Sequence, residues 1–254
     1  MMSNATIVSQ RLVDRWFFIG VALSMILLNV IGFGPSIVDP SGRSVPLPLT
    51  PLVAAHTIVS VALLLLFLAQ ATLIATGRAD VHRRLGIVGA ALASAFVGLG
   101  YLTLVGEARR GFDLSGDLSS LPPPPGVAAV AAIMGPIVQL LLFGILLGAG
   151  LYYRHRPDVH KRLMLLAVLG VLSQTPMAHV TTHWPALHPW ANVMFPATSA
   201  VFLSLSAVYD RAVSGRIHPV SLWVPIVVFV LQNVFFIVIV PTAVWNSLAT
   251  WLIR

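Results

Sequence analysis

Eight histidines are the side chains of this 254-residue chain best suited to bind a metal or a haem, since the chain has no cysteine. His179 and His183 are four residues apart in HVTTH, a spacing that puts both imidazoles on one helix face and that zinc or iron sites can use. His56 can supply a third imidazole. Glu107 can supply a carboxylate, either as a ligand or as the group that orients an imidazole. These four residues form a candidate metal site.

A second pair of histidines lies in a repeated pattern. The segments RADVHRRL (78–85) and RPDVHKRL (156–163) agree at six of eight positions, and His82 and His160 occupy matching places. Two histidines that face each other across a helical bundle can be the axial ligands of a haem, or can bind a quinone or a lipid phosphate. The neighbouring arginines suit haem propionates or phosphates through charge-assisted hydrogen bonds.

A purely structural interpretation of the same residues stays open. Arginines in short turns hold the topology of a membrane protein and anchor to anionic head groups. Asp80 and Asp158 lie just ahead of the next apolar run, where a carboxylate favours a helix start, and Pro157 suits a first helical position. In this interpretation the histidines of the repeat are interfacial, and HVTTH is a polar helix end beside Trp184.

Long apolar runs must position these side chains. Apolar residues make up 57% of the chain and charged residues 9%, whereas soluble domains carry roughly 25% charged residues. The runs are continuous rather than alternating, which predicts an all-α membrane helical bundle and not a β-barrel. We expect a single transmembrane domain over 1–254 with a proline-rich outer loop at 107–126. About seven transmembrane helices are predicted, at 16–34, 51–76, 85–106, 127–152, 163–184, 191–209 and 220–246.

The basic residues predict the orientation of the bundle. With the N-terminus inside and the C-terminus outside, eleven of the fifteen lysines and arginines fall on inner segments. The net charge of +7 then lies at the inner face, so it does not indicate nucleic-acid binding. The two copies of the repeat have the same orientation, which suggests parallel repeats made of helices two–three and four–five.

The middle of each predicted span lacks Asp, Glu, Lys and Arg, which argues against proton pumps, ion-coupled carriers and voltage sensors. The polar residues found there are amides, which we expect to make hydrogen bonds between helices. These amides are Asn29, Gln70, Gln139, Gln174, Gln232 and Asn233.

Three inner segments carry a resemblance. HRxLG at His82–Gly86, HKRLM at His160–Met164 and GRxHP at Gly215–Pro219 resemble segments of uncharacterised bacterial polytopic membrane proteins. The resemblance implies a multi-pass protein of the bacterial inner membrane, and brings no activity with it.

The chain is more loosely similar to membrane cytochromes b and ferric-reductase-like proteins. That similarity implies an inner haem b between His82 and His160, and an outer one between His56 and His179 or His183. The chain departs from that pattern because helix four has no histidine. A second departure is that His160 and His179 lie about 28 Å apart along a helix, at the membrane edges. Zinc hydrolases resembling adiponectin receptors and alkaline ceramidases offer another comparison, but they carry their HxxxH pair on the last helix.

The first functional prediction is therefore a histidine-liganded membrane redox protein that transfers electrons through haem b. One alternative is a non-catalytic subunit or assembly factor of a larger membrane complex, with no cofactor. The other is a zinc-dependent membrane hydrolase that uses the HxxxH pair. The expected partners are the lipid bilayer and either a quinone or a membrane protein complex. Whether the protein is an enzyme stays open.

Overall fold

The structure, a computed structural model, describes residues 4–38, 50–110 and 126–254; the side chains of residues 4–12, 36, 110, 171, 182, 183, 185, 188, 191 and 192 are not described. The described residues form helices joined by turns, without strands, and the predicted all-α bundle is confirmed. The helices are α1 (Asn4–Val38), α2 (Pro51–Ala75), α3 (Ala79–Arg110), α4 (Ala129–Ile133), α5 (Ile137–Tyr152), α6 (Pro157–Leu172), α7 (Gln174–His183), α8 (Ala191–Ser214), α9 (Pro219–Val234) and α10 (Ala243–Leu252), with a 3₁₀ turn at Pro185–Trp190 and a π-helical turn at Phe235–Ile239.

Seven helical stretches in the described part of the chain are long and apolar enough to cross a membrane. They are Val13–Pro35, Pro51–Ala75, Ala79–Arg109, Ala129–Tyr152, Pro157–Thr181, Val193–Ser214 and Pro219–Ile239. Two of them begin six residues before the predicted start, because the repeated DVH segments are the first turns of α3 and α6 rather than loops. The predicted number of spans therefore agrees with the structure.

The last predicted span and the predicted outer loop also differ from the structure. The last predicted run, 220–246, is interrupted after Ile239, because Pro241 lacks a backbone N–H and Thr242 begins a new helix. The Thr242 Oγ1 accepts a hydrogen bond from the Trp245 N–H at 3.1 Å. At the other boundary, residues 107–110 of the predicted outer loop continue α3, while 111–125 lie outside the described residues.

Proline and acidic residues begin helices as the sequence predicts. Pro157 is the first residue of α6, and Asp158 lies in its first turn. Asp80 has the same place in α3. His218 precedes α9, and its Nδ1 accepts a hydrogen bond from the Val220 N–H at 3.1 Å. This contact gives the histidine of the GRxHP segment a structural role as a helix cap.

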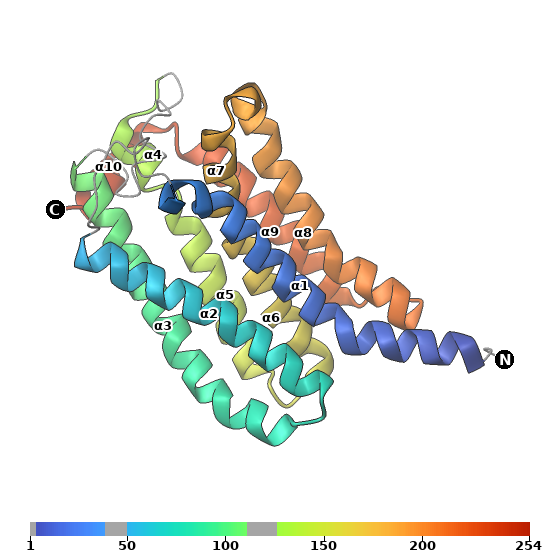
Figure 1. The fold of residues 1–254 in the computed structure, drawn as a ribbon. Coiled ribbons are helices and arrows are strands. Elements are labelled where there is room, and N and C mark those ends of the chain that lie inside the picture. Colours follow the sequence, from blue (N-terminus) through green and yellow to red (C-terminus); the bar gives the residue numbers. More distant parts are fainter. Residues whose placement is uncertain (1–3, 39–49, 111–125) are drawn as a thin grey trace.

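The central helix of the bundle is α6. In the span that contains α6, 71% of the residues of the apolar stretch are buried, against 17–39% in the other six spans. It packs against α5, α8 and α9, while α2 and α3 form a neighbouring hairpin (Figure 1). Leu165, Leu166 and Leu169 are fully buried here and form the middle of the core. Any site in the first turn of α6 is therefore held by several helices.

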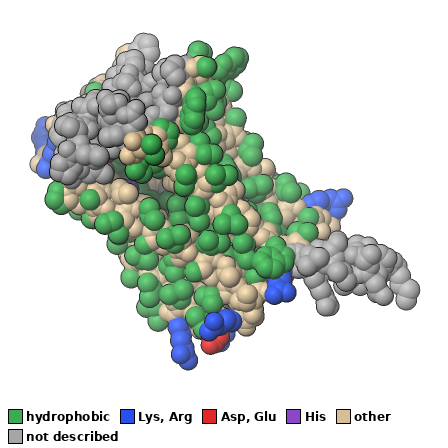
Figure 2. Space-filling view, viewed as in Figure 1, with side chains coloured by type: hydrophobic (Ala, Val, Ile, Leu, Met, Phe, Trp, Pro, Cys, Tyr) green, Lys and Arg blue, Asp and Glu red, His purple; other side chains and the backbone are tan. Residues whose placement is uncertain are grey.

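The surface divides into an apolar belt and a basic end. Figure 2 shows hydrophobic side chains over the middle of the molecule and Lys or Arg side chains at its lower end. Large apolar side chains such as Leu27, Ile87, Val201 and Ile237 are exposed, which suits contact with lipid. The α2–α3 and α5–α6 turns both lie at the basic end (Figure 1). These features are those of a multi-pass membrane protein.

Candidate functional site

The two histidines of the repeat meet at the basic end of the bundle. His82 stands in the first turn of α3 and His160 in the first turn of α6. Their ring centres are 6.3 Å apart and their planes are nearly perpendicular, at 85°. The structure thus brings the two imidazoles of the repeat close together. Their function as ligands stays a prediction.

A backbone carbonyl orients the His160 ring. Its Nδ1 lies 2.7 Å from the Gly150 carbonyl oxygen on α5. Because a carbonyl only accepts hydrogen bonds, Nδ1 carries the ring proton, and in the neutral ring Nε2 keeps a free lone pair. A Cβ on Gly150 would lie 2.7 Å from the Met164 Sδ, so the glycine allows α5 to approach α6 this closely. Metal-binding histidines typically have this arrangement, with one nitrogen held by a carbonyl and the other free.

An amide from α2 orients the His82 ring. With the amide oriented to satisfy all its neighbours, the Gln70 nitrogen donates to His82 Nδ1 at 2.6 Å and to the His82 carbonyl at 3.2 Å. The Gln70 oxygen accepts from the Gly86 N–H at 3.2 Å. His82 Nδ1 is therefore an acceptor, and the neutral ring carries its proton on Nε2. The two imidazoles have complementary tautomers, with Nε2 a donor on His82 and an acceptor on His160.

Two of the predicted interhelical amides do connect helices. Gln70 joins α2 to α3, as described above, and Gln232 of α9 donates to the Gly170 carbonyl of α6 at 2.8 Å. Asn29 and Asn233 instead donate to carbonyls within their own helices. The amide nitrogen of Gln174 is buried with no hydrogen-bond partner in the described structure.

The histidines of the predicted outer site pack on aromatic rings. His56 on α2 stacks on Phe96 of α3 with ring centres 5.3 Å apart, and its buried Nδ1 has no hydrogen-bond partner among the described residues. His179 on α7 is buried, 4.3 Å between ring centres from Phe33 of α1. Both imidazoles therefore pack against the face or edge of a phenylalanine ring.

The rest of the predicted metal site is only partly described. Glu107 lies in the half-buried end of α3, and His183 ends α7 with a side chain outside the described set. Within the described part of the chain, no group of three or more His, Asp or Glu side chains fits a metal ion. The site of His56, Glu107, His179 and His183 accordingly stays a prediction.

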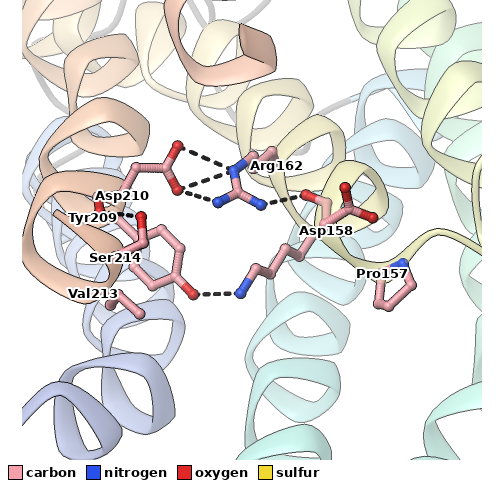
Figure 3. A pocket seen from close by; sticks show the side chains of 8 residues that line it. Pro157, Asp158, Arg162, Tyr209, Asp210, Val213 and Ser214 are labelled. Atoms are coloured by element: carbon pink, nitrogen blue, oxygen red, sulfur yellow. Dashed lines mark hydrogen bonds and ion pairs between the residues drawn. The ribbon is translucent and has the colours of Figure 1, made fainter. Parts of the chain in front are cut away.

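A buried ion pair near the histidines is not evident from the sequence. Arg162 of α6 donates from Nε to both carboxylate oxygens of Asp210 on α8, at 3.0 and 3.1 Å, and Nη2 makes a further contact (Figure 3). Only 8% of Arg162 and none of Asp210 is exposed. The Asp210 Oδ2 also accepts from the His218 N–H at 2.9 Å. Arg162, expected as a topology anchor, is instead an internal link between α6, α8 and the start of α9.

A second set of contacts ties α1 to the same place. The Lys161 ammonium lies 3.2 Å from the Asp14 carboxylate, and the Tyr209 hydroxyl contacts both residues. His218 Nε2 lies 3.4 Å from the Asp158 carboxylate. A cavity of about 320 Å³ opens beside these groups (Figure 3). Its lining is Pro157, Asp158, Lys161, Arg162, Tyr209, Asp210, Val213 and Ser214.

That cavity is a structural junction more than a binding site. Its two basic and two acidic side chains balance in charge, and each of the four has a partner within the protein. A buried group that is already paired has little capacity to recognise a ligand. The signal for this junction in the sequence is only the local sequence YDR at the end of α8, which gives no hint of its partner on α6.

Comparison with protein families, with curated proteins and with solved structures gave no match.

Proposed function

We propose that the protein is a membrane redox protein that holds a haem b between His82 and His160. One observation carries this proposal, the 6.3 Å separation of the two ring centres. Two imidazoles on opposite sides of one metal, each with a metal–nitrogen bond of about 2 Å, have ring centres roughly 6 Å apart. The 85° angle between the ring planes is compatible with such a pair, because ligation through one nitrogen of each ring would not fix the angle between the two planes.

The neighbouring residues support ligation unequally. The Gly150 carbonyl already holds His160 with Nε2 free for a metal. His82 would have to carry its proton on Nδ1 instead of Nε2, and the Gln70 amide would have to turn its oxygen toward that proton. A bound haem would supply one-electron transfer, with its potential set by ligands, hydrogen bonds and burial.

The proposal is limited to the inner pair. His56 packs on Phe96 of α3, whereas His179 packs on Phe33 of α1. No described contact therefore supports an outer haem between the two histidines. The inner position, in the first turns of two helices, suits exchange of electrons with a partner at the membrane surface. A quinone in the bilayer or a protein at that surface are the two classes of partner within reach.

An absorption spectrum tests the proposal. Detergent-purified protein from haem-replete cells should show reduced-minus-oxidised bands of a b-type haem. The variants His82→Ala and His160→Ala should each lose most of this absorbance. His155→Ala is the matched control, because His155 is exposed in the turn just before α6 and should leave the spectrum unchanged.

A colourless wild-type preparation, or a haem spectrum that neither variant alters, contradicts the proposal. In the first case the imidazole pair is a structural contact, and the protein is better explained as a non-catalytic subunit or assembly factor. Zinc analysis of the same preparation tests the hydrolase alternative, since a His179→Ala, His183→Ala variant should then lose stoichiometric zinc.

A further inference from the structure

The turns that carry the two histidines also bring five arginines together. Arg78, Arg83 and Arg84 belong to the α2–α3 turn and the start of α3, and Arg154 and Arg156 to the α5–α6 turn. All five are exposed. Because the His82 and His160 rings are in contact, the two turns lie side by side at the basic end (Figure 1). We refer to these five residues as the double-turn patch.

The carboxylates at this end of the bundle are engaged elsewhere. Among the described residues, Asp14 pairs with Lys161, Asp210 with Arg162, and Asp158 with His218. The remaining acid, Asp80, lies in the first turn of α3, where a carboxylate favours the start of the helix. None of the described ion pairs includes an arginine of the double-turn patch. Arg156 also interacts electrostatically with Asp158, whereas the other four arginines have no described ion-pair partner, so most of the positive charge of the patch remains for a ligand from outside the chain.

The position of the double-turn patch indicates where that ligand comes from. Lys and Arg side chains at the lower end directly border the apolar belt (Figure 2). A guanidinium at such a border meets the phosphates of the bilayer, and binds them through paired N–H donors better than an ammonium does. Five guanidinium groups on two adjoining turns match a head group with more than one phosphate.

We infer that the double-turn patch binds the head group of an anionic phospholipid, and prefers one with two phosphates. This inference does not depend on a haem. It differs from general attraction of basic loops to the membrane, because it requires both turns together and excludes other arginines of the same end. Basic clusters between membrane helices are a known kind of site for such head groups.

Lipid-dependent thermal stability tests the inference. The purified, delipidated protein is melted with added cardiolipin, phosphatidylglycerol or phosphatidylcholine, and lipid-bound states are counted by native mass spectrometry. Cardiolipin should stabilise most and phosphatidylcholine not at all. An arginine near the membrane surface contributes about a fivefold change in affinity, so Arg83→Gln/Arg156→Gln should weaken cardiolipin binding roughly 25-fold.

The matched control removes the same charge from other helices. Arg15→Gln/Arg216→Gln changes two exposed arginines of α1 and the α8–α9 turn, and should keep cardiolipin binding. Equal losses in the two variants would overturn the inference, as would equal stabilisation by phosphatidylcholine or by inorganic pyrophosphate without lipid. If the glutamine variant does not fold, Arg83→Lys/Arg156→Lys keeps the charge. It should bind with intermediate affinity, and unchanged affinity would contradict recognition by guanidinium groups.

Discussion

At the scale of single residues, the charged side chains that the structure describes differ in burial. Arg162 and Asp210 are buried and bonded to each other, whereas the arginines of the double-turn patch are exposed. A buried pair contributes little net stability relative to an apolar pair, but loss of one partner leaves a charge without compensation. The Arg162–Asp210 pair is thus more sensitive to single substitution than any surface charge of the molecule.

Substitution of one member of that pair should be severe. We expect Asp210→Asn to lower the free energy of unfolding by about 3–5 kcal/mol, because it leaves the Arg162 guanidinium buried without a counter-charge. Thermal or denaturant unfolding in detergent measures this loss. Asp80→Asn, at an exposed carboxylate, is the control and should change stability by less than about 1 kcal/mol.

The double variant Arg162→Met/Asp210→Leu should recover much of the stability that Asp210→Asn loses. Wild-type stability in Asp210→Asn would show that the pair is not buried in the bilayer-embedded protein.

At the scale of helices, close approach depends on a few small residues. Gly32 of α1 crosses α7 at Pro176, and a Cβ on Gly32 would lie 2.5 Å from the Pro176 carbonyl oxygen and 2.9 Å from its Cα. Backbone atoms cannot move aside as a side chain does. The crossing positions His179, which packs on Phe33 one residue further along α1. Small residues at helix crossings are the usual device for close packing in membranes.

The glycine at this crossing should resist substitution. We expect Gly32→Ala to destabilise the protein by about 1–3 kcal/mol, because the added methyl group forces α1 away from α7. Gly20→Ala is the matched control in the same helix, since a Cβ there meets nothing within 4 Å and alanine is the better helix former. The difference in melting temperature between the two variants measures the effect. A tolerated Gly32→Ala would show that α1 and α7 are not in contact at this point.

The sequence predicts most of the helices. It also indicates that His82 and His160 can lie close together. Spans follow from uncharged runs, and the repeat predicts that His82 and His160 meet, because two parallel hairpins return their turns to the same face. The support given by Gln70 and the Gly150 carbonyl is not predictable in that way. Neither is the Arg162–Asp210 pair, since it depends on how α6 packs against α8, and local pattern contains no information on that packing.

At the scale of the whole molecule, Lys and Arg side chains are prominent at one end of an apolar bundle (Figure 2), while Arg109 and Arg254 lie together at the other end. The positive-inside rule then predicts that the α2–α3, α5–α6 and α8–α9 turns are cytoplasmic. The turn at Pro185–Trp190 would lie on the opposite side. The orientation decides whether the proposed haem site and the proposed lipid site lie at the inner or the outer surface.

The absence of cysteine makes the orientation directly measurable. A single cysteine at the exposed position 155, in His155→Cys, should react with a membrane-impermeant maleimide only after the cells are opened. A single cysteine at the exposed position 190, in Trp190→Cys, should react in intact cells. The opposite labelling pattern would reverse the predicted topology while leaving the fold unchanged.

The central position of α6 has a consequence for the synthesis of the protein. Arg162 leaves the ribosome 48 residues before Asp210, its partner. At about 5–20 residues per second, the guanidinium waits roughly 2–10 s for its carboxylate. If α6 inserts during that interval, it does so before α8 and α9 are in place. The helix that is most buried in the folded protein is then still exposed. Until the last helices close around it, the arginine lacks its carboxylate, and water or lipid phosphates at the membrane surface can solvate it.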